Sequence, residues 1–192
     1  MSLKIILLIG HLIGMALGAG GATLSDVLFL TSVRDNLIDR SELRLLRAAA
    51  RVVIAGLALL TITGIGFFFT DSQPSERFWA KVTIVGIAAL NGYWLHRQLF
   101  PLFARCAHQQ PPLFTAQTSR HAWRVVSAGY ISAVSWYAAL VLGVWRNAPF
   151  SYWEILGGYL GIVVSGLLFA NLALYLLMKW RTAKITISAT EF

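Results

Sequence analysis

The chain has 192 residues, of which 57% are hydrophobic and 12% charged, and its formal net charge is +8. This composition, with a mean hydropathy of +0.68, is typical of a membrane protein rather than a soluble domain. Its single cysteine excludes an internal disulfide and any zinc or iron–sulfur site built on cysteines. The positive charge does not indicate binding to nucleic acid, because the arginines lie in loops between apolar segments.

The first apolar segment, residues 3–33, is long enough to cross a bilayer, which takes about 20 apolar residues. It nevertheless contains His11 and Asp26, and ionisable groups at that depth usually face protein or a cavity. At 100° per residue, the same helix face also carries Gly14, Met15, Gly18, Ala22 and Ser25. Small residues let another helix, or a flat cofactor, approach the backbone. We therefore expect a retained, inward-facing helix rather than a cleaved signal peptide.

Four further apolar segments follow, at residues 52–69, 78–103, 123–145 and 153–180. Asp39 and Glu42 have the spacing of a capping box, so a helix should begin near Arg40 and continue into the second segment. There is no internal repeat and no soluble domain. The sequence therefore predicts a single all-α domain over residues 1–192, an integral membrane bundle of five transmembrane helices.

The arginine distribution predicts the orientation of this bundle. Five arginines lie between the first and second segments, at positions 34, 40, 44, 47 and 51. Four lie in or beside the loop between the third and fourth, at positions 97, 105, 120 and 124. The other two connections carry only Arg77 and Lys81, and Arg146. By the positive-inside rule, the N-terminus lies outside and the C-terminus in the cytoplasm. We expect a multi-pass protein of a bacterial-type cytoplasmic (inner) membrane, with the lipid bilayer as its surroundings and its oligomeric state open.

Polar side chains could meet at two depths, because the first and third helices run in the same direction. His11 and Lys81 lie near the outer ends, and Asp26 and His96 lie 15 residues further along, or about 22 Å at the helical rise. If the two faces meet, His11 lies by Lys81 and Asp26 by His96. His121 and Arg124, where the fourth helix begins, are placed to join the inner group. We expect Asp26 to be paired, since an unpaired carboxylate at that depth is costly.

The stretch from His11 to Gly21 resembles the first-helix pattern of the copper-resistance D (CopD) family, a histidine followed nine and ten residues later by paired glycines. The similarity covers roughly residues 11–101 and continues through Arg51, Thr63-Gly64, Lys81, Ala89-Leu90-Asn91, Leu99 and Pro101. The related HemJ-type protoporphyrinogen oxidases, membrane proteins that bind haem b, are similar in placing a histidine in the first helix and a lysine in the third. Gly18 departs from the tryptophan usual in the family, and the Leu-Pro-Arg-type sequence of HemJ proteins is missing. Protoporphyrinogen is therefore not the expected substrate.

His11 and Lys81 each have two interpretations. Imidazole is a ligand of haem iron, and the face formed by Gly14, Gly18 and Ala22 would give a macrocycle room; otherwise His11 forms a hydrogen bond between helices. Lys81 would be a metal ligand or the partner of a haem propionate, or its stem would simply extend to the lipid headgroups.

Three functions fit these features. The first, which we favour, is a haem b redox protein that transfers electrons or oxidises a quinone- or porphyrin-like substrate, with an unidentified redox partner. The second is a copper or other metal-ion permease of the CopD type, although copper(I) prefers soft ligands and the chain has one cysteine and three methionines. The third is a structural or assembly subunit whose polar residues fix helix packing. No pattern assigns catalytic residues.

Overall fold

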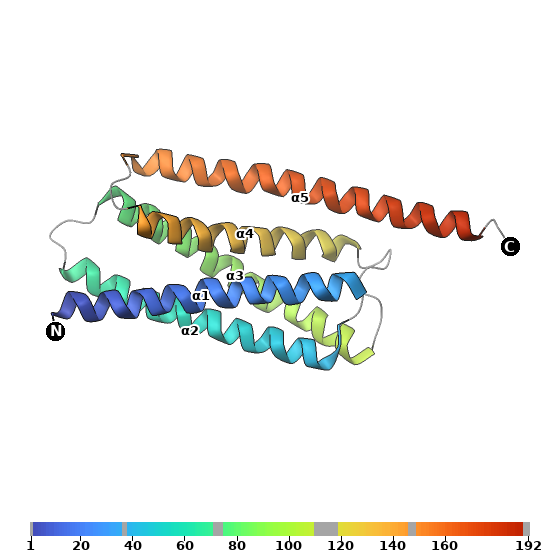
Figure 1. Ribbon diagram of the computed structural model, residues 1–192, viewed down its shortest axis with the longest axis horizontal. Helices are drawn as coiled ribbons and strands as arrows, with labels where there is room; N and C mark the ends of the chain where they lie inside the picture. Colours follow the sequence, from blue (N-terminus) through green and yellow to red (C-terminus); the bar gives the residue numbers. More distant parts are fainter. Residues whose placement is uncertain (1, 36–37, 71–74, 110–118, 146–148, 190–192) are drawn as a thin grey trace.

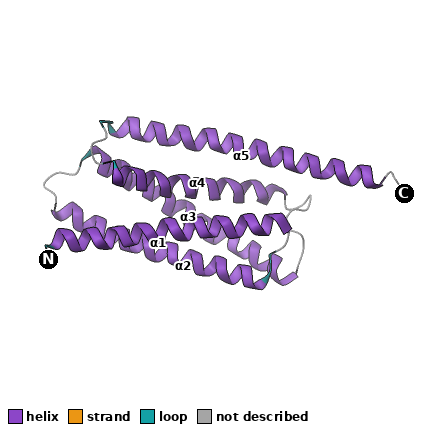
Figure 2. Ribbon diagram, viewed as in Figure 1, coloured by secondary structure: helices purple, strands orange, loops and turns teal. Residues whose placement is uncertain are grey.

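The computed structural model describes residues 2–35, 38–70, 75–109, 119–145 and 149–189, and nearly all of these are helical. The helices are α1 (Leu3–Asp35), α2 (Arg40–Thr70), α3 (Glu76–Gln109), α4 (Ser119–Val144) and α5 (Tyr152–Ala189). Each runs antiparallel to the preceding one, so the start of α1 and the end of α5 lie at opposite ends of the bundle (Figure 1). Within the described ranges there are helices and short connections but no strands (Figure 2). The predicted all-α fold is confirmed.

Four of the helices are long and apolar enough to cross a membrane: α1 over Leu3–Ser32, α2 over Arg40–Thr70, α4 over Trp123–Val144 and α5 over Tyr152–Ala173. Helix α3 has the length but a less apolar sequence, because Lys81, Asn91 and Arg97 interrupt it. Large apolar side chains are exposed on the outside of the bundle, among them Phe69 and Trp153. These features indicate a multi-pass membrane protein.

The start of α2 confirms the predicted capping box. The backbone N–H of Glu42 donates to Asp39 Oδ1 at 2.6 Å, and Glu42 Oε2 accepts from the backbone N–H of Asp39 at 3.1 Å. The hydrogen bond from the Glu42 backbone holds the pKa of the Asp39 carboxyl below its usual range. Helix α2 therefore begins at Arg40, well before the apolar segment, and the arginines that precede this segment belong to the same helix.

The first two residues of α3 fix the connection between α4 and α5. Glu76 Oε2 accepts a hydrogen bond of 2.8 Å from the backbone N–H of Tyr152, where α5 begins. The Arg77 guanidinium donates one of 2.8 Å to the backbone oxygen of Trp145, where α4 ends. A carboxylate at a helix N-terminus and a cation at a C-terminus both complement the helix dipoles. These two hydrogen bonds connect α3, α4 and α5 at the end of the bundle that is predicted to lie outside.

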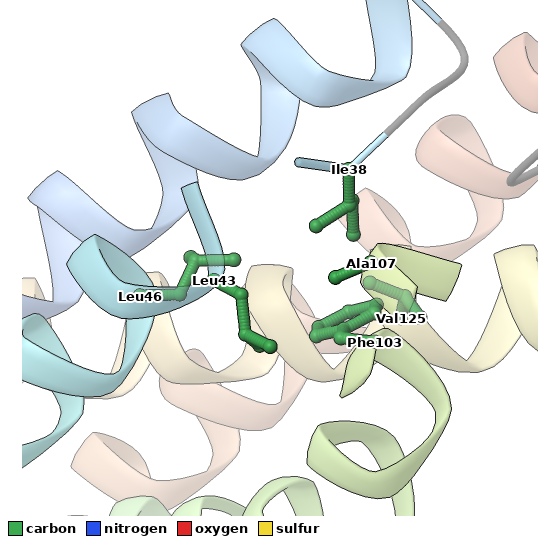
Figure 3. Packing of buried hydrophobic residues seen from close by; sticks show 6 residues of the cluster. All are labelled: Ile38, Leu43, Leu46, Phe103, Ala107 and Val125. Carbon is green, nitrogen blue, oxygen red and sulfur yellow. The ribbon is translucent and has the colours of Figure 1, made fainter. Parts of the chain in front are cut away.

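Helix α4 contributes to each of three buried clusters. The first joins α2, α3 and α4 at the arginine-rich end and consists of Ile38, Leu43, Leu46, Phe103, Ala107 and Val125 (Figure 3). The second joins α1, α2 and α4 through Ala19, Ala22, Leu60 and Trp136. The third joins α3, α4 and α5 through Ile84, Ala139, Tyr159 and Val163. Because α4 takes part in all of them, it is the central helix of the bundle.

Candidate functional site

The small-residue face of α1 packs against α2. A Cβ added at Gly14 would lie 3.0 Å from the backbone oxygen of Gly56, and one added at Gly56 would lie 2.7 Å from the backbone oxygen of Gly14. Both distances are too short for an ordinary contact, so the two helices approach this closely only because both residues are glycine. Of the two uses expected for this face, the structure shows the approach of another helix.

The indole of Trp136, from α4, covers the next part of the same face. A Cβ at Gly18 would overlap its six-membered ring, and Trp136 itself is only 3% exposed. Ala22 is buried in the same cluster. The face formed by Gly14, Gly18 and Ala22 is therefore filled by protein, and it does not offer the room for a macrocycle that the sequence suggested.

His11 lies beside α2, near the end of the bundle where α1 begins. Its Nδ1 is 2.9 Å from Thr63 Oγ1, and the Thr63 hydroxyl in turn donates to the backbone oxygen of Leu59 at 2.7 Å. Because the hydroxyl proton is used in that bond, the Thr63 oxygen accepts from His11 Nδ1–H. The proton of a neutral imidazole is thereby fixed on Nδ1, which leaves a lone pair on Nε2. No described residue forms a hydrogen bond with Nε2, and Phe67 packs edge-on against the ring at 5.6 Å.

Lys81 is half-buried near the start of α3, and its charge acts electrostatically on the imidazole of His11. Among the described residues, no Cα atom of α1 lies within 8 Å of one in α3, so the two helices meet only through side chains. One such contact joins Phe29 and Phe103, whose ring centroids are 6.0 Å apart. The structure therefore brings His11 and Lys81 into the same region without the direct helix contact that we expected.

In the part of the chain that the structure describes, no hydrogen bond or ion pair joins the polar residues expected to meet at the inner depth, Asp26, His96 and Arg124. Asp26 is half-buried and faces α4, where a Cβ at Gly129 would lie 3.2 Å from its Oδ1. His96 is exposed on α3 and its ring packs against Phe100, with centroids 5.0 Å apart. Arg124 is exposed as well. The side chain of His121 lies outside the described side chains. Asp26 therefore has no partner among the described side chains, and its pairing stays a prediction.

A cavity of about 430 Å³ lies between α3, α4 and α5, on the side of the bundle where α4 begins. It is lined by Asn91, Trp94, Trp123, Arg124, Ser127, Ala128, Ile131 and Asn171. Asn91 Nδ2 donates to the backbone oxygen of Ala128 at 2.8 Å, and Asn171 Nδ2 reaches Ser127 Oγ at 3.5 Å. The buried Asn171 Oδ1 has no hydrogen-bond partner among the described residues. Sequence reasoning missed this site, although asparagines within apolar helices are a signal that could have found it.

A second cavity, of about 680 Å³, lies between α4 and α5. Most of its lining is apolar, and its tyrosine hydroxyls already have partners. Tyr137 is bonded to Thr23 at 3.0 Å, and Tyr159 to Ser135 at 2.9 Å. A cavity of this kind suits an apolar chain, such as that of a lipid, and has little to orient a polar ligand.

Within the described residues there is no group of three or more histidine, cysteine, aspartate or glutamate side chains that could hold a metal ion. Met15, the methionine nearest His11 in sequence, packs against the second and third buried clusters. A metal bound by His11 would therefore need other ligands, such as the nitrogens of a macrocycle.

Comparisons with protein-family models, with curated proteins and with solved structures find no match to this chain.

Proposed function

We propose that this chain is a five-span protein of a bacterial-type cytoplasmic membrane that binds haem b through His11 and takes part in electron transfer. The observation that carries the proposal is the hydrogen bond from His11 Nδ1 to Thr63, because it leaves the lone pair of Nε2 free to bind a metal. Histidines that bind metals commonly use one ring nitrogen as the ligand while the other donates a hydrogen bond. The resemblance to CopD and HemJ-type proteins adds support through its histidine in the first helix and its lysine in the third.

The residues around His11 would hold a haem iron, but those on the glycine face leave no room for the macrocycle. Thr63 orients the imidazole. Lys81 would pair with a propionate as an ammonium group, or would bind the iron as a neutral amine. The ring would not lie against Gly14 and Gly18, because α2 and Trp136 cover that face. When bound, the haem iron supplies one-electron chemistry, for which a quinone is a suitable partner.

The absorption spectrum of protein purified after expression with ample haem tests this proposal. We expect a Soret band that shifts on reduction and that His11→Ala abolishes. Thr63→Val should weaken haem retention by about 10–100-fold, since it removes the group that orients the imidazole. His96→Ala is the matched control, because His96 is exposed and distant in sequence from His11, and it should retain the band.

A Soret band retained in His11→Ala would refute ligation by His11. Colourless protein that instead retains copper would favour the metal-ion permease. Colourless protein without copper would favour a structural or assembly subunit.

A further inference from the structure

The cavity between α3, α4 and α5 has the chemistry of a lipid headgroup site. Trp94 and Trp123 contribute two of its walls, and tryptophan is enriched where membrane helices reach the headgroup region. This places the cavity near the depth of the lipid phosphates rather than in the middle of the hydrocarbon. Its volume of about 430 Å³ lies in the range of small-molecule sites.

Two polar groups of this cavity have no partner among the residues that the structure describes. Asn171 Oδ1 is buried and accepts no hydrogen bond. If the amide is turned over, Nδ2 becomes the unpaired atom, since Ser127 can reach only one of the two positions. The Arg124 guanidinium lines the same cavity and makes no hydrogen bond or ion pair with another described residue. An unsatisfied buried amide atom is costly, so a ligand that supplies the missing bond is favoured.

Arginines at the same end of the bundle favour an anionic ligand. Arg40, Arg44, Arg47 and Arg51 are all exposed on α2, and their spacing of four, three and four residues puts them on one helix face. They lie at the same end of the bundle as the cavity, because α2 and α4 both begin there (Figure 1). Together with Arg124 they create a positive potential that attracts anionic lipids.

We propose that this cavity binds the headgroup of an anionic phospholipid that carries hydroxyl groups, such as phosphatidylglycerol. Arg124 binds the phosphate, the side-chain amide of Asn171 turns toward the cavity to bond a glycerol hydroxyl, and the tryptophans pack on the glycerol backbone. Basic pockets between membrane helices are known to hold anionic headgroups. The cavity between α4 and α5 is a poorer candidate, since its tyrosine hydroxyls are already paired. The proposal is independent of haem binding, because none of its residues contacts His11.

Native mass spectrometry of the full-length protein tests the proposed lipid binding. The protein is first exchanged into an equimolar mixture of phosphatidylglycerol, phosphatidylethanolamine and phosphatidylcholine with identical acyl chains. We expect the wild type to retain phosphatidylglycerol over phosphatidylcholine by about tenfold. All three lipids carry the phosphate, but Arg124 repels the ammonium group of the two zwitterionic ones, and choline has no hydroxyl to offer Asn171. Arg124→Gln and Asn171→Leu should each remove most of this preference, whereas Arg124→Lys should keep part of it. The matched control is Arg97→Gln, because Arg97 is exposed on α3 and bonded to Tyr93 rather than to the cavity.

Equal retention of the three lipids, or an unchanged preference in Arg124→Gln, would mean adventitious surface lipid only and would overturn the proposal. Preference for phosphatidylethanolamine would overturn its anionic part. Since Arg124 is exposed, Arg124→Gln and Arg124→Lys are expected to fold, and an unchanged thermal midpoint confirms that a lost preference is a binding effect.

Discussion

The Asp26 carboxylate has no compensating positive charge or hydrogen-bond donor among the described residues. Asp26 is half-buried against the backbone of α4. Three residues earlier, by contrast, Thr23 forms a hydrogen bond of 3.0 Å with Tyr137 of the same helix α4. An uncompensated carboxylate at this half-buried position lowers the free energy of unfolding, whereas the hydrogen bond between the Thr23 and Tyr137 hydroxyls raises it.

We expect Asp26→Asn to leave the free energy of unfolding unchanged or to raise it by about 1 kcal/mol, since the amide is cheaper to bury than the carboxylate. Thr23→Val should lower it by about 0.6 kcal/mol, the mean for such bonds between membrane helices. Reversible unfolding in mixed micelles measures both variants. A marked loss of stability in Asp26→Asn would show that the carboxylate has a partner, which was our expectation from the sequence.

The Asp39 carboxyl gives the start of α2 a dependence on pH. The folded-state pKa of Asp39 is lowered by the hydrogen bond from the Glu42 backbone. The stability that this carboxylate gives to the helix start is therefore present above the unfolded pKa of about 3.9. It is lost as the pH falls through the folded pKa. We expect the hydrogen-exchange protection of the Glu42 amide to be constant above about pH 4 and to fall below it. Asp39→Asn should keep a constant protection, because its amide oxygen accepts the same bond without titrating. Low protection at every pH is expected for Asp39→Ala.

At the scale of the helices, the contact of α1 with α2 depends on glycine at two facing positions. A Cβ at Gly56 would lie 2.5 Å from the backbone nitrogen of Gly18 and 2.7 Å from the backbone oxygen of Gly14. Backbone atoms cannot move aside as a flexible side chain can, so the helices would have to separate. The same helix offers a control at Gly64, where a Cβ would meet no atom within 4 Å.

Gly56→Ala should therefore destabilise the protein by about 1–3 kcal/mol, the usual cost of overpacking. Gly64→Ala should be neutral or stabilising by up to about 1 kcal/mol, because alanine is the better helix former. The difference between their unfolding free energies is the measurement. Equal effects of the two substitutions would contradict the close packing of α1 on α2.

The helices could be predicted from sequence because their signals are local. Apolar length, the Asp39–Glu42 capping box and the loops between apolar segments gave five helices, and the structure has five. Which helices are neighbours could not be predicted in this way. Glycines on one face serve a helix and a cofactor equally well, and the ring that covers Gly18 comes from Trp136, more than a hundred residues away. The unpaired Oδ1 of Asn171 likewise depends on how α5 packs against α4, which no local signal predicts.

At the scale of the whole molecule, the number of membrane crossings decides where the termini lie. Helix α3 is less apolar than the other four, yet it runs antiparallel to both α2 and α4 (Figure 1). It is joined to α4 by the bond from Asn91 to Ala128 and to the α4–α5 connection by Glu76 and Arg77. We therefore expect α3 to cross with its neighbours, with Asn91 facing α4 instead of lipid.

Five crossings put the two termini on opposite sides of the membrane, whereas four would put them on the same side. Because the arginines gather at the end where α2 begins, we expect the N-terminus outside and the C-terminus in the cytoplasm. Alkaline phosphatase fused after Phe192 should be inactive and a fluorescent protein at the same position should fluoresce. The control fusions end at Thr70, at the opposite end of the bundle, and should show the reverse pattern. Active phosphatase at both positions would mean that α3 does not cross, and the polar side chains of Lys81 and Asn91 would then have to lie outside the hydrocarbon.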